Sequence, residues 1–392
     1  MKIGFIFRTD APKEEGDNLT IIEGLMRGLN LLDHKAVAST SPFSIPDADF
    51  FLFSNSTLEQ KQLLEEVSLL NRPFGLLGFQ EDLLRYYIPA SGFCKFVLHC
   101  LGYGLPTDNG LHCHLDLLIE RPDVAYYYGE PPKRVIPYNH PLIRKASFWI
   151  ANSPTEAKTL QRDFPGCKTA VIPVPPSIAT EYQGTPDDSF LQYSGLGSKN
   201  YLLQVGMLEP CKNQLGTILA TRHLDIPLVF IATTPSDYGN ICFEAAVKWR
   251  KAPTIFISES IEARKEGSVR MIPISQGKKI PSSILLSAYH HAGLYIHPAF
   301  QDLPGTTYLA AARLGVPTIA SSWSPITDYL FDPEQGHSRL DGRILYYEPY
   351  RLNEIEQGVI QHFGKEFPPL LNHITILRTE KQSAQDLITA IE

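Results

Sequence analysis

The sequence predicts a two-domain α/β protein built on parallel sheets. Short apolar runs alternate with helix-length segments along most of the 392 residues. That length favours two domains. Residues 175–200 interrupt the alternation with Pro-Pro, Gly-Thr-Pro-Asp-Asp and Ser-Gly-Leu-Gly-Ser, a composition typical of turns and linkers. Because strands that alternate with helices pair in parallel through crossover helices, each half is expected to form its own sheet.

The first half is expected to begin with a buried strand at residues 2–7. This apolar run meets Arg8 and Asp10 and lacks the small-residue cleavage site of a signal peptide. Residues 18–32 are expected to be helical because Ile21, Leu25 and Leu29 recur at helical spacing. The same patterns predict strands at 35–39, 50–53, 75–78, 124–128, 147–151 and 170–174, and helices at 57–70 and 154–163.

The second half repeats the alternation after the linker. Its predicted strands are 201–205, 228–231, 254–257, 271–274, 294–297, 318–321 and 344–347. Its predicted helices are 213–223, 237–250, 282–292, 306–314, 325–330 and 352–363, with a last helix over 376–391. We therefore expect Rossmann-like domains at 1–180 and 198–375, with a C-terminal helix at 376–392 that could pack back on the first domain.

Composition excludes several classes of protein. The net charge is −7, so no global basic surface favours nucleic-acid binding. No apolar stretch approaches the ~18–20 residues that span a bilayer. The six cysteines contain no Cys-x-x-Cys pair, which favours a reduced, cytoplasmic protein. The 31 prolines are scattered, which indicates many turns and strand ends.

The most informative segment runs from residue 294 to residue 322, where a strand, a loop, a helix, a turn and a strand follow one another. Gly305 permits close approach of a ligand, and Thr306 is expected to cap the helix. The start of a helix offers free N–H groups to an anion. Asp302 could hold sugar hydroxyls. The alternative is a plain strand–helix unit with an ordinary cap.

Residues 298–321 resemble the donor-site signature of GT-B glycosyltransferases, especially the large retaining family 4. The match runs without a gap. The positions that agree are Pro298, Gly305, Ala311, Gly315, Pro317, Ile319, Ala320 and Ser321. Asp302 takes the place of the first glutamate of that signature, and Ala310 takes the place of the second.

Residues 201–214 are similar to the Val-Gly-Arg-Leu-x-x-x-Lys-Asn loop of the same family. There the arginine and the lysine neutralise the donor diphosphate. Here Lys212 is present, whereas Met207 replaces the arginine. From the residues alone, a lysine just before a helix can bring one cation to a phosphate, although such a lysine is usually a solvated residue.

The first half carries two weaker matches. Residues 126–134, Tyr-Tyr-Tyr-Gly-Glu-Pro-Pro-Lys-Arg, resemble a family loop in which a histidine lies near the sugar. Gly129 stands in place of that histidine, while Glu130 and Arg134 are retained and are expected on the acceptor side. Residues 147–173 resemble the strand–Ser–helix–strand unit that closes the first domain.

The resemblance implies the GT-B fold, in which two Rossmann-like domains face each other across a cleft. It implies retaining transfer from a nucleotide sugar, a UDP- or GDP-sugar, to a glycan or lipid-linked acceptor, with neither a metal nor another cofactor. Lys212 and Asp302 would be the catalytic residues. The expected donor-binding residues are Gly206, Met207, Lys212, Asp302, Leu303, Pro304, Gly305, Thr306, Thr307 and Ala310.

Two other functions stay open. The missing charged groups at Met207 and Ala310 favour a weak or inactive relative that binds a glycan or stabilises a partner. A sugar-nucleotide epimerase of the same architecture is disfavoured, because its histidine and carboxylate set is not evident.

His112 and His114 are too few to make a structural zinc site. The basic cluster within 133–145 could touch an anionic acceptor or a membrane surface, although a solvated loop is favoured.

Overall fold

The computed structural model describes most of the chain. The described residues are 1–7, 17–54, 61–78, 83–102, 143–173, 186–232, 237–258, 262–274, 280–303, 305–324, 328, 331–332, 337–338, 344–368 and 379–392. The predicted strand at 124–128, the histidines near 113 and most of the predicted helix at 325–330 lie outside this part. Gly129, Glu130, Arg134 and Pro304 also lie outside it.

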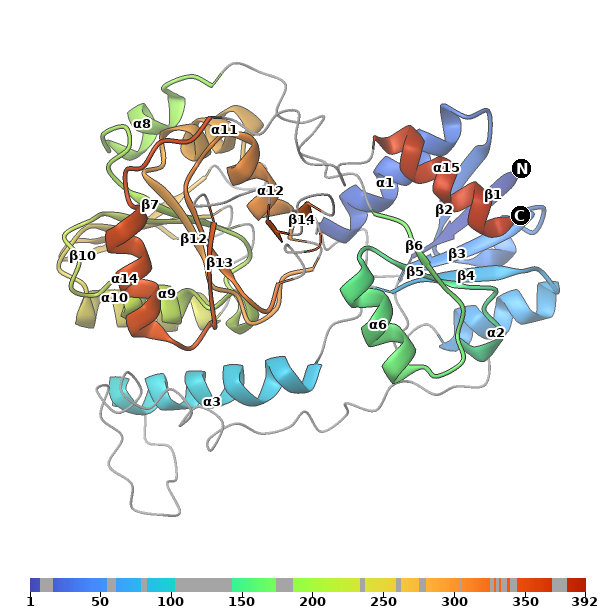
Figure 1. Cartoon of the computed structure of the whole chain (residues 1–392), viewed down its shortest axis with the longest axis horizontal. Coiled ribbons are helices and arrows are strands. Elements are labelled where there is room, and N and C mark those ends of the chain that lie inside the picture. The colour runs from blue at the N-terminus through green and yellow to red at the C-terminus, as the bar shows by residue number, and fades with distance from the viewer. Residues whose placement is uncertain are drawn as a thin grey trace, which may run out of the picture.

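The N-terminal domain is built on a six-stranded sheet in the order β2-β1-β3-β4-β5-β6, and all of these neighbours pair in parallel (Figure 1). The strands are β1 (Lys2–Ile6), β2 (Lys35–Ser39), β3 (Phe50–Ser54), β4 (Phe74–Leu77), β5 (Trp149–Ala151) and β6 (Thr169–Val171). Helices α1 (Asp17–Asn30) and α15 (Glu380–Ile391) cover one face of the sheet. Helices α2 (Lys61–Leu70) and α6 (Pro154–Asp163) cover the other.

Helix α15 lies along α1, so that the two ends of the chain meet in this domain (Figure 1). Leu25 and Leu29 of α1 share an apolar cluster with Leu387 and Ile388 of α15. The side chain of Thr379 caps α15 in a capping box with Gln382. Arg27 of α1 forms a 2.7 Å ion pair with Glu380.

The C-terminal domain is built on an eight-stranded sheet in the order β10-β11-β9-β8-β7-β12-β13-β16. Only the edge pair β10–β11 is antiparallel among these neighbours. In this order the strands are β10 (Arg264–Glu266), β11 (Val269–Pro273), β9 (Thr254–Ser258), β8 (Leu228–Ala232), β7 (Leu202–Val205), β12 (Leu294–His297), β13 (Thr318–Ser321) and β16 (Ile344–Tyr347). Strands β14 (Phe331–Asp332) and β15 (His337–Ser338) form a separate antiparallel pair.

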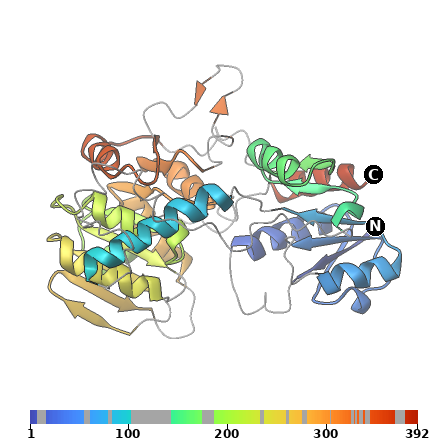
Figure 2. The same ribbon diagram turned by 90° about the horizontal axis from the view of Figure 1, so that it is seen from below.

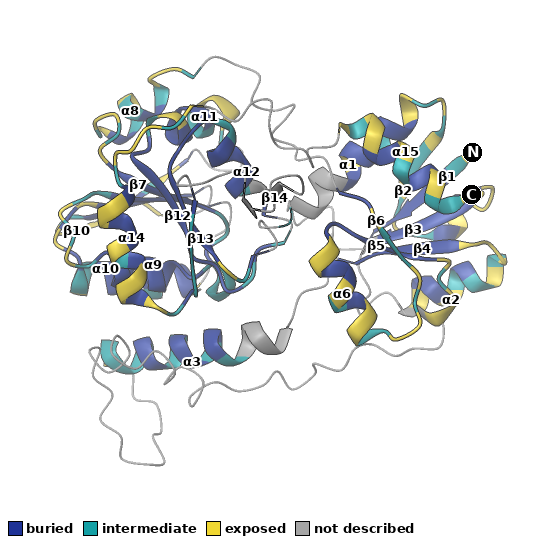
Figure 3. Ribbon diagram, viewed as in Figure 1, coloured by how far each residue is buried: buried dark blue, intermediate teal, exposed yellow. Residues whose placement is uncertain are grey.

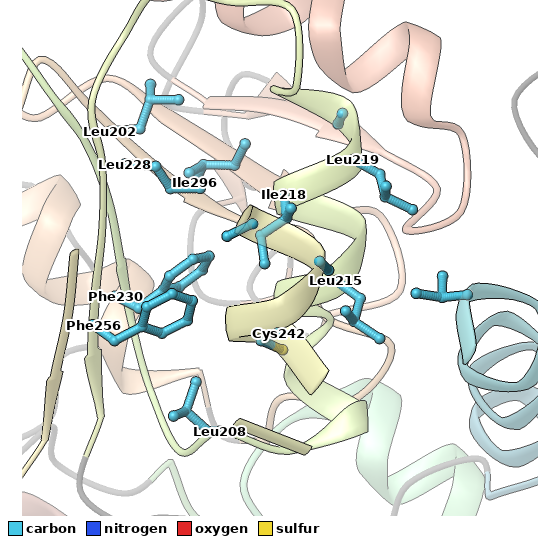
Figure 4. Packing of buried hydrophobic residues seen from close by; sticks show 14 of the residues in the cluster. Leu202, Leu208, Leu215, Ile218, Leu219, Leu228, Phe230, Cys242, Phe256 and Ile296 are labelled. Carbon is cyan, nitrogen blue, oxygen red and sulfur yellow. The ribbon is translucent and has the colours of Figure 1, made fainter. Parts of the chain in front are cut away.

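Helices cover both faces of the C-terminal sheet. Helices α9 (Gln214–Ala220), α10 (Asp237–Trp249) and α14 (Leu352–His362) pack on one face, where the rings of Phe230 and Phe256 stack at 4.9 Å (Figure 4). Helices α8 (Ser189–Ser194), α11 (Ser282–His291) and α12 (Thr306–Arg313) pack on the other. Figure 3 shows that the central strands of both sheets are buried, whereas exposed residues lie on the surrounding helices and on edge strands such as β10 and β2. The prediction of an α/β fold with two parallel sheets is confirmed.

Helix α3 (Leu83–Leu101) was not predicted, and it packs on the C-terminal domain although its neighbours in sequence, β4 and β5, belong to the N-terminal sheet. Both views place α3 against the C-terminal domain (Figure 1, Figure 2). The pattern is hard to recognise because Pro89 lies inside the helix and apolar residues occur around much of its circumference.

Two further expectations were wrong. Helix α8 interrupts the stretch predicted to be turns and linker, because Phe190 packs against Tyr201 in the core of the C-terminal domain. Thr306 does not cap α12, because the N-cap residue is Gly305. Within the described residues, the search for a helix long and apolar enough to cross a bilayer found none.

Candidate functional site

The candidate site lies at the carboxyl ends of β7 and β12. These strands are parallel neighbours, since Leu202 pairs with Leu294 and Leu203 with Tyr295. The loops that follow them therefore meet at one edge of the sheet, where ligands bind in open α/β folds. The loop after β7 contains the 3-10 turn η5 (Pro210–Lys212), and the loop after β12 (residues 298–303, here called the β12 loop) contains Asp302.

Lys212 and Asp302 form an ion pair, although 90 residues separate them in sequence. The Nζ atom of Lys212 lies 2.5 Å from Oδ1 of Asp302, and it also donates to the carbonyl oxygen of Gln301 at 3.3 Å. Only 16% of the Lys212 side chain and 6% of the Asp302 side chain are exposed. Burial by itself would raise the pKa of Asp302, but the Lys212 ammonium and then His297 outweigh it and hold that pKa below its ordinary value.

His297 completes this cluster and was missed by the sequence analysis. It is the last residue of β12 and is fully buried. Its Nε2 atom lies 3.6 Å from Oδ2 of Asp302, whereas Lys212 contacts the other oxygen, Oδ1. Its ring packs against the rings of Tyr295 and Tyr308, and the Tyr308 hydroxyl donates to the His297 carbonyl. The signal in the sequence was a histidine at the end of a buried strand, directly before the matched Pro298.

Two buried amide side chains join the loops of the site. The Nε2 atom of Gln204 donates to the Lys212 carbonyl at 2.7 Å and lies 3.3 Å from Nδ1 of His297. The Nδ2 atom of Asn213 donates to the carbonyls of Pro298 and Pro349, at 2.8 Å and 2.7 Å. Asn213 thereby joins the loops after β7, β12 and β16. Asn213 aligns with the asparagine of the Lys-Asn pair in the family loop, but only Lys212 of that pair was predicted to belong to the site.

Glycines allow close packing at two positions. Gly206 has φ +150° at the end of β7, and a Cβ atom there would lie 3.4 Å from the His297 ring and 3.9 Å from Cγ of Lys212. Gly305 has φ +80° at the start of α12, and a Cβ atom would lie 3.2 Å from Tyr308 and 3.5 Å from Oγ of Ser324. Side chains rarely adopt such φ values, so both positions favour glycine.

The other expected donor-binding residues differ in how far they are buried. Met207 is partly buried, and its carbonyl accepts a 2.7 Å hydrogen bond from Gln214. Leu303 and Thr307 are partly buried on either side of Gly305. Ala310 is buried in the apolar cluster beneath α12, so that its side chain offers only a methyl group. The side chain of Thr306 lies outside what the structure describes.

The site therefore combines a cation, a carboxylate, a buried imidazole and the start of a helix. A lysine and the first N–H groups of α12 can hold an anion such as a phosphate. Because Asp302 already engages Lys212, an incoming anion would compete for that ammonium. Among the described residues, no group of three or more His, Cys, Asp or Glu side chains is placed to hold a metal ion.

Comparison with known proteins identifies the fold. No protein-family model matches the sequence, and none of the curated proteins matches it. Among solved structures, sucrose-phosphate synthase from Thermosynechococcus elongatus matches with a TM-score of 0.57 and 12% identity, over 100% of this chain and 94% of that one. Anabaena HepE in complex with UDP and glucose matches with a TM-score of 0.54 and 14% identity, over 100% and 94%.

A third structure agrees with these two. The E. coli trehalose-6-phosphate synthase bound to UDP-2-fluoro glucose matches with a TM-score of 0.53 and 11% identity, over 100% of this chain and 95% of that one. All three are GT-B structures with two parallel-sheet domains. This chain has the GT-B fold. In this GT-B chain, the Lys212–Asp302 pair lies in the C-terminal of the two domains.

Proposed function

We propose that the protein is a glycosyltransferase that moves a sugar from a nucleotide sugar, with retention at the anomeric carbon, to a glycan or lipid-linked acceptor. The observation that carries this proposal is the buried Lys212–Asp302 pair beside the start of α12. UDP is the first nucleotide to test, because UDP and UDP-2-fluoro glucose are bound in two of the matching structures. A GDP-sugar is the alternative.

In this proposal the diphosphate of the donor lies against Lys212 and the first N–H groups of α12. The bond between the sugar C1 and the diphosphate oxygen breaks, and its electron pair leaves with the nucleoside diphosphate. The acceptor hydroxyl forms the new bond to C1 and gives up its proton. The positive charge of Lys212 and of the helix start would stabilise the negative charge that develops on the leaving group. Asp302 would orient Lys212 and hydrogen-bond the donor sugar.

The domain assignment is part of the same proposal. Residues 198–375 would hold the donor, and residues 1–180 would supply the acceptor side, with Glu130 and Arg134 facing it. We also propose a reduced, cytoplasmic setting, because the six cysteines of the sequence are few and contain no Cys-x-x-Cys pair. If the acceptor is lipid-linked, the basic cluster within 133–145 would contact the membrane surface.

A second candidate function is a weak or inactive glycosyltransferase-like protein that binds a glycan or stabilises a partner. Two positions favour it. Ala310 presents a buried methyl group where the resemblance expects a glutamate, and Met207 brings no charge to the diphosphate. Each lost charge-assisted hydrogen bond would weaken donor binding by about 1.5–3 kcal/mol.

Turnover of a panel of radiolabelled UDP- and GDP-sugars tests the proposal, with glycan and lipid-linked acceptors. We expect turnover of one donor, and we expect Lys212→Ala to abolish it while the exposed Lys251→Ala keeps it. Full activity in Lys212→Ala would disprove the site assignment. The anomeric configuration of the product, measured by NMR, tests retention. Calorimetric binding of a nucleotide sugar without turnover would favour an inactive protein that still binds the donor.

A further inference from the structure

Helix α3 connects the N-terminal part of the chain to the candidate site. Ala90, Phe93, Phe96 and Val97 are buried on α3, and they share one apolar cluster with Leu208, Leu215 and Tyr238 of the C-terminal domain. Lys248 of α10 donates to the carbonyl of Cys100 near the end of α3, at 2.6 Å. From Ala90 to Cys100, the helix is therefore held against the domain that contains Lys212 and Asp302.

Two described contacts bring α3 to the loops of the site. The helix packs against η5, the turn that contains Lys212. The ring of Phe93 lies 6.1 Å from the ring of Phe300, at an interplanar angle of 59°. Phe93 and Phe300 are 1% and 4% exposed, so the contact excludes water. Such a tilted arrangement lies within the favourable range for aromatic pairs.

Phe300 is joined to both halves of the ion pair. It lies in the β12 loop two residues before Asp302. The backbone N–H groups of Phe300 and Gln301 both donate to the carbonyl of Cys211, at 2.8 Å and 3.1 Å. Cys211 directly precedes Lys212, and the Gln301 carbonyl accepts from the Lys212 ammonium. A shift of the Phe300 ring would therefore move the backbone on both sides of the Lys212–Asp302 contact.

Phe93 is also the first ring of an aromatic row that follows the carboxyl edge of the sheet. Phe300 lies 6.0 Å from Trp323, which follows β13, and Trp323 lies 5.6 Å from Tyr350, which follows β16. The row thus joins α3 to the loops after three neighbouring strands. Phe93 is its one member from the N-terminal part of the chain.

We propose that Phe93 is a positioning residue for the donor site and acts through Phe300 on the Lys212–Asp302 pair. The ligand in this proposal, a nucleoside diphosphate sugar, rests on the proposed function. The effect of Phe93 on the backbone of Phe300 and Gln301 does not depend on that function. Without the Phe93 ring, Phe300 loses its packing partner on α3. The hydrogen bonds from Phe300 and Gln301 to Cys211 then open more often, and fewer molecules present Lys212 and Asp302 in the arrangement that binds the diphosphate.

The test compares Phe93→Ala, the conservative Phe93→Leu and the control Val97→Ala, which truncates a fully buried residue on the same helix and in the same cluster. Hydrogen exchange at the Phe300 and Gln301 amides is measured in the ligand-free full chain. Phe93→Ala should speed exchange by about tenfold, and the other two variants by much less. Kd values for UDP and UDP-glucose are measured on the same samples. Phe93→Ala should raise both by about tenfold, because a small misplacement of binding groups is costly.

The outcomes separate this proposal from the proposed function. Unchanged exchange in Phe93→Ala overturns the proposal, whatever the wild type binds. Equal effects of Val97→Ala on exchange and on Kd overturn the specific role of Phe93. Faster exchange with an unchanged Kd shows a ring that only packs, and this also overturns it. If the wild type binds no nucleotide sugar, the proposed function fails and the donor-site role fails with it, whereas faster exchange would still show that Phe93 holds the β12 loop.

Discussion

The Nε2 atom of His297 lies 3.6 Å from Oδ2 of Asp302, and the ammonium of Lys212 contacts the other oxygen, Oδ1, of the same carboxylate. Neither Nε2 of His297 nor Oδ2 of Asp302 has a hydrogen-bond partner among the described residues. At 3.6 Å these two atoms are too far apart for a hydrogen bond, and a small shift of either side chain would bring an Nε2–H group within reach of Oδ2.

We expect His297→Phe to impair donor binding more than it impairs stability. Phenylalanine fills a similar volume beside Tyr295 and Tyr308, but it cannot donate to Asp302. If Nε2 and Oδ2 close to hydrogen-bond distance when a donor binds, the bond that His297→Phe cannot form corresponds to about 1.5–3 kcal/mol, and the Kd for a nucleotide sugar should rise by at least about tenfold. His297→Gln can still donate and serves as the control. Calorimetry measures both variants, and equal affinity in His297→Phe and the wild type would contradict the expected role.

The Lys212–Asp302 pair predicts a strongly non-additive double-mutant cycle in stability. Lys212→Met keeps the length of the side chain but leaves the Asp302 carboxylate buried without its ammonium partner. Breaking a buried pair in this way costs about 3–5 kcal/mol in the free energy of unfolding. Asp302→Asn in the Lys212→Met background should recover much of the loss, because it removes the uncompensated charge. Urea unfolding measures all four proteins, and additive losses would contradict a coupled pair.

The lowered pKa of Asp302 predicts how its contribution to stability depends on pH. Because the pKa in the folded state lies below the ordinary value of about 3.9, the contribution is complete above that pH. It declines as the pH falls from about 4 toward the lowered pKa, because the protonated acid no longer pairs with Lys212. The free-energy difference between wild type and Asp302→Asn should therefore be constant from pH 7 to about 5 and shrink below about 4. Urea unfolding across this range checks the sign, with the exposed Asp225→Asn as the control.

Asn213 is expected to be among the most sensitive residues of the site. Its φ of +57° disfavours most side chains, its Oδ1 atom accepts from the Gly216 N–H, and its Nδ2 atom joins two other loops. Asn213→Ala should lower the free energy of unfolding by about 2–4 kcal/mol, because two buried carbonyls lose their partner and α9 loses its cap. Asn213→Asp keeps the cap but cannot donate to the carbonyls of Pro298 and Pro349, so it should show how much these two hydrogen bonds contribute. If Asn213→Ala lowers the free energy of unfolding by less than about 1 kcal/mol, Asn213 does not stabilise the loops in this way.

The packing of α15 on α1 predicts an unusual glycine effect. Alanine in place of a glycine inside a helix normally stabilises by about 0.5–1 kcal/mol. At Gly28, however, a Cβ atom would lie 2.1 Å from the Glu380 carbonyl oxygen and 3.0 Å from the Ala384 side chain. Gly28→Ala should therefore speed hydrogen exchange in α15 and destabilise the domain by about 1–3 kcal/mol. Glu380→Ala removes only the partly exposed pair with Arg27 and should cost less than about 1 kcal/mol.

Local patterns were enough to predict the two parallel sheets, because β-branched runs bounded by turn residues are short-range signals. They were not enough for α3, since its buried face is specified by the other domain and Pro89 obscures its period. Lys212 and Asp302 were both identified, but their contact depends on β7 and β12 being neighbours in the sheet. His297 and Asn213 were missed because a buried polar residue carries no periodic signal of its own.

The contact between α1 and α15 also constrains the order in which the molecule can be completed during synthesis. The ribosome produces α15 only after every strand of the C-terminal sheet. Until then, Leu25 and Leu29 of α1 lack the helix that covers them, and the buried face of α3 likewise awaits a domain that has not yet been made. The N-terminal domain should therefore stay incomplete while the second domain is translated. For the same reason, cutting the chain between its two sheets should leave two fragments that expose apolar surface and aggregate, and neither should fold as an independent domain.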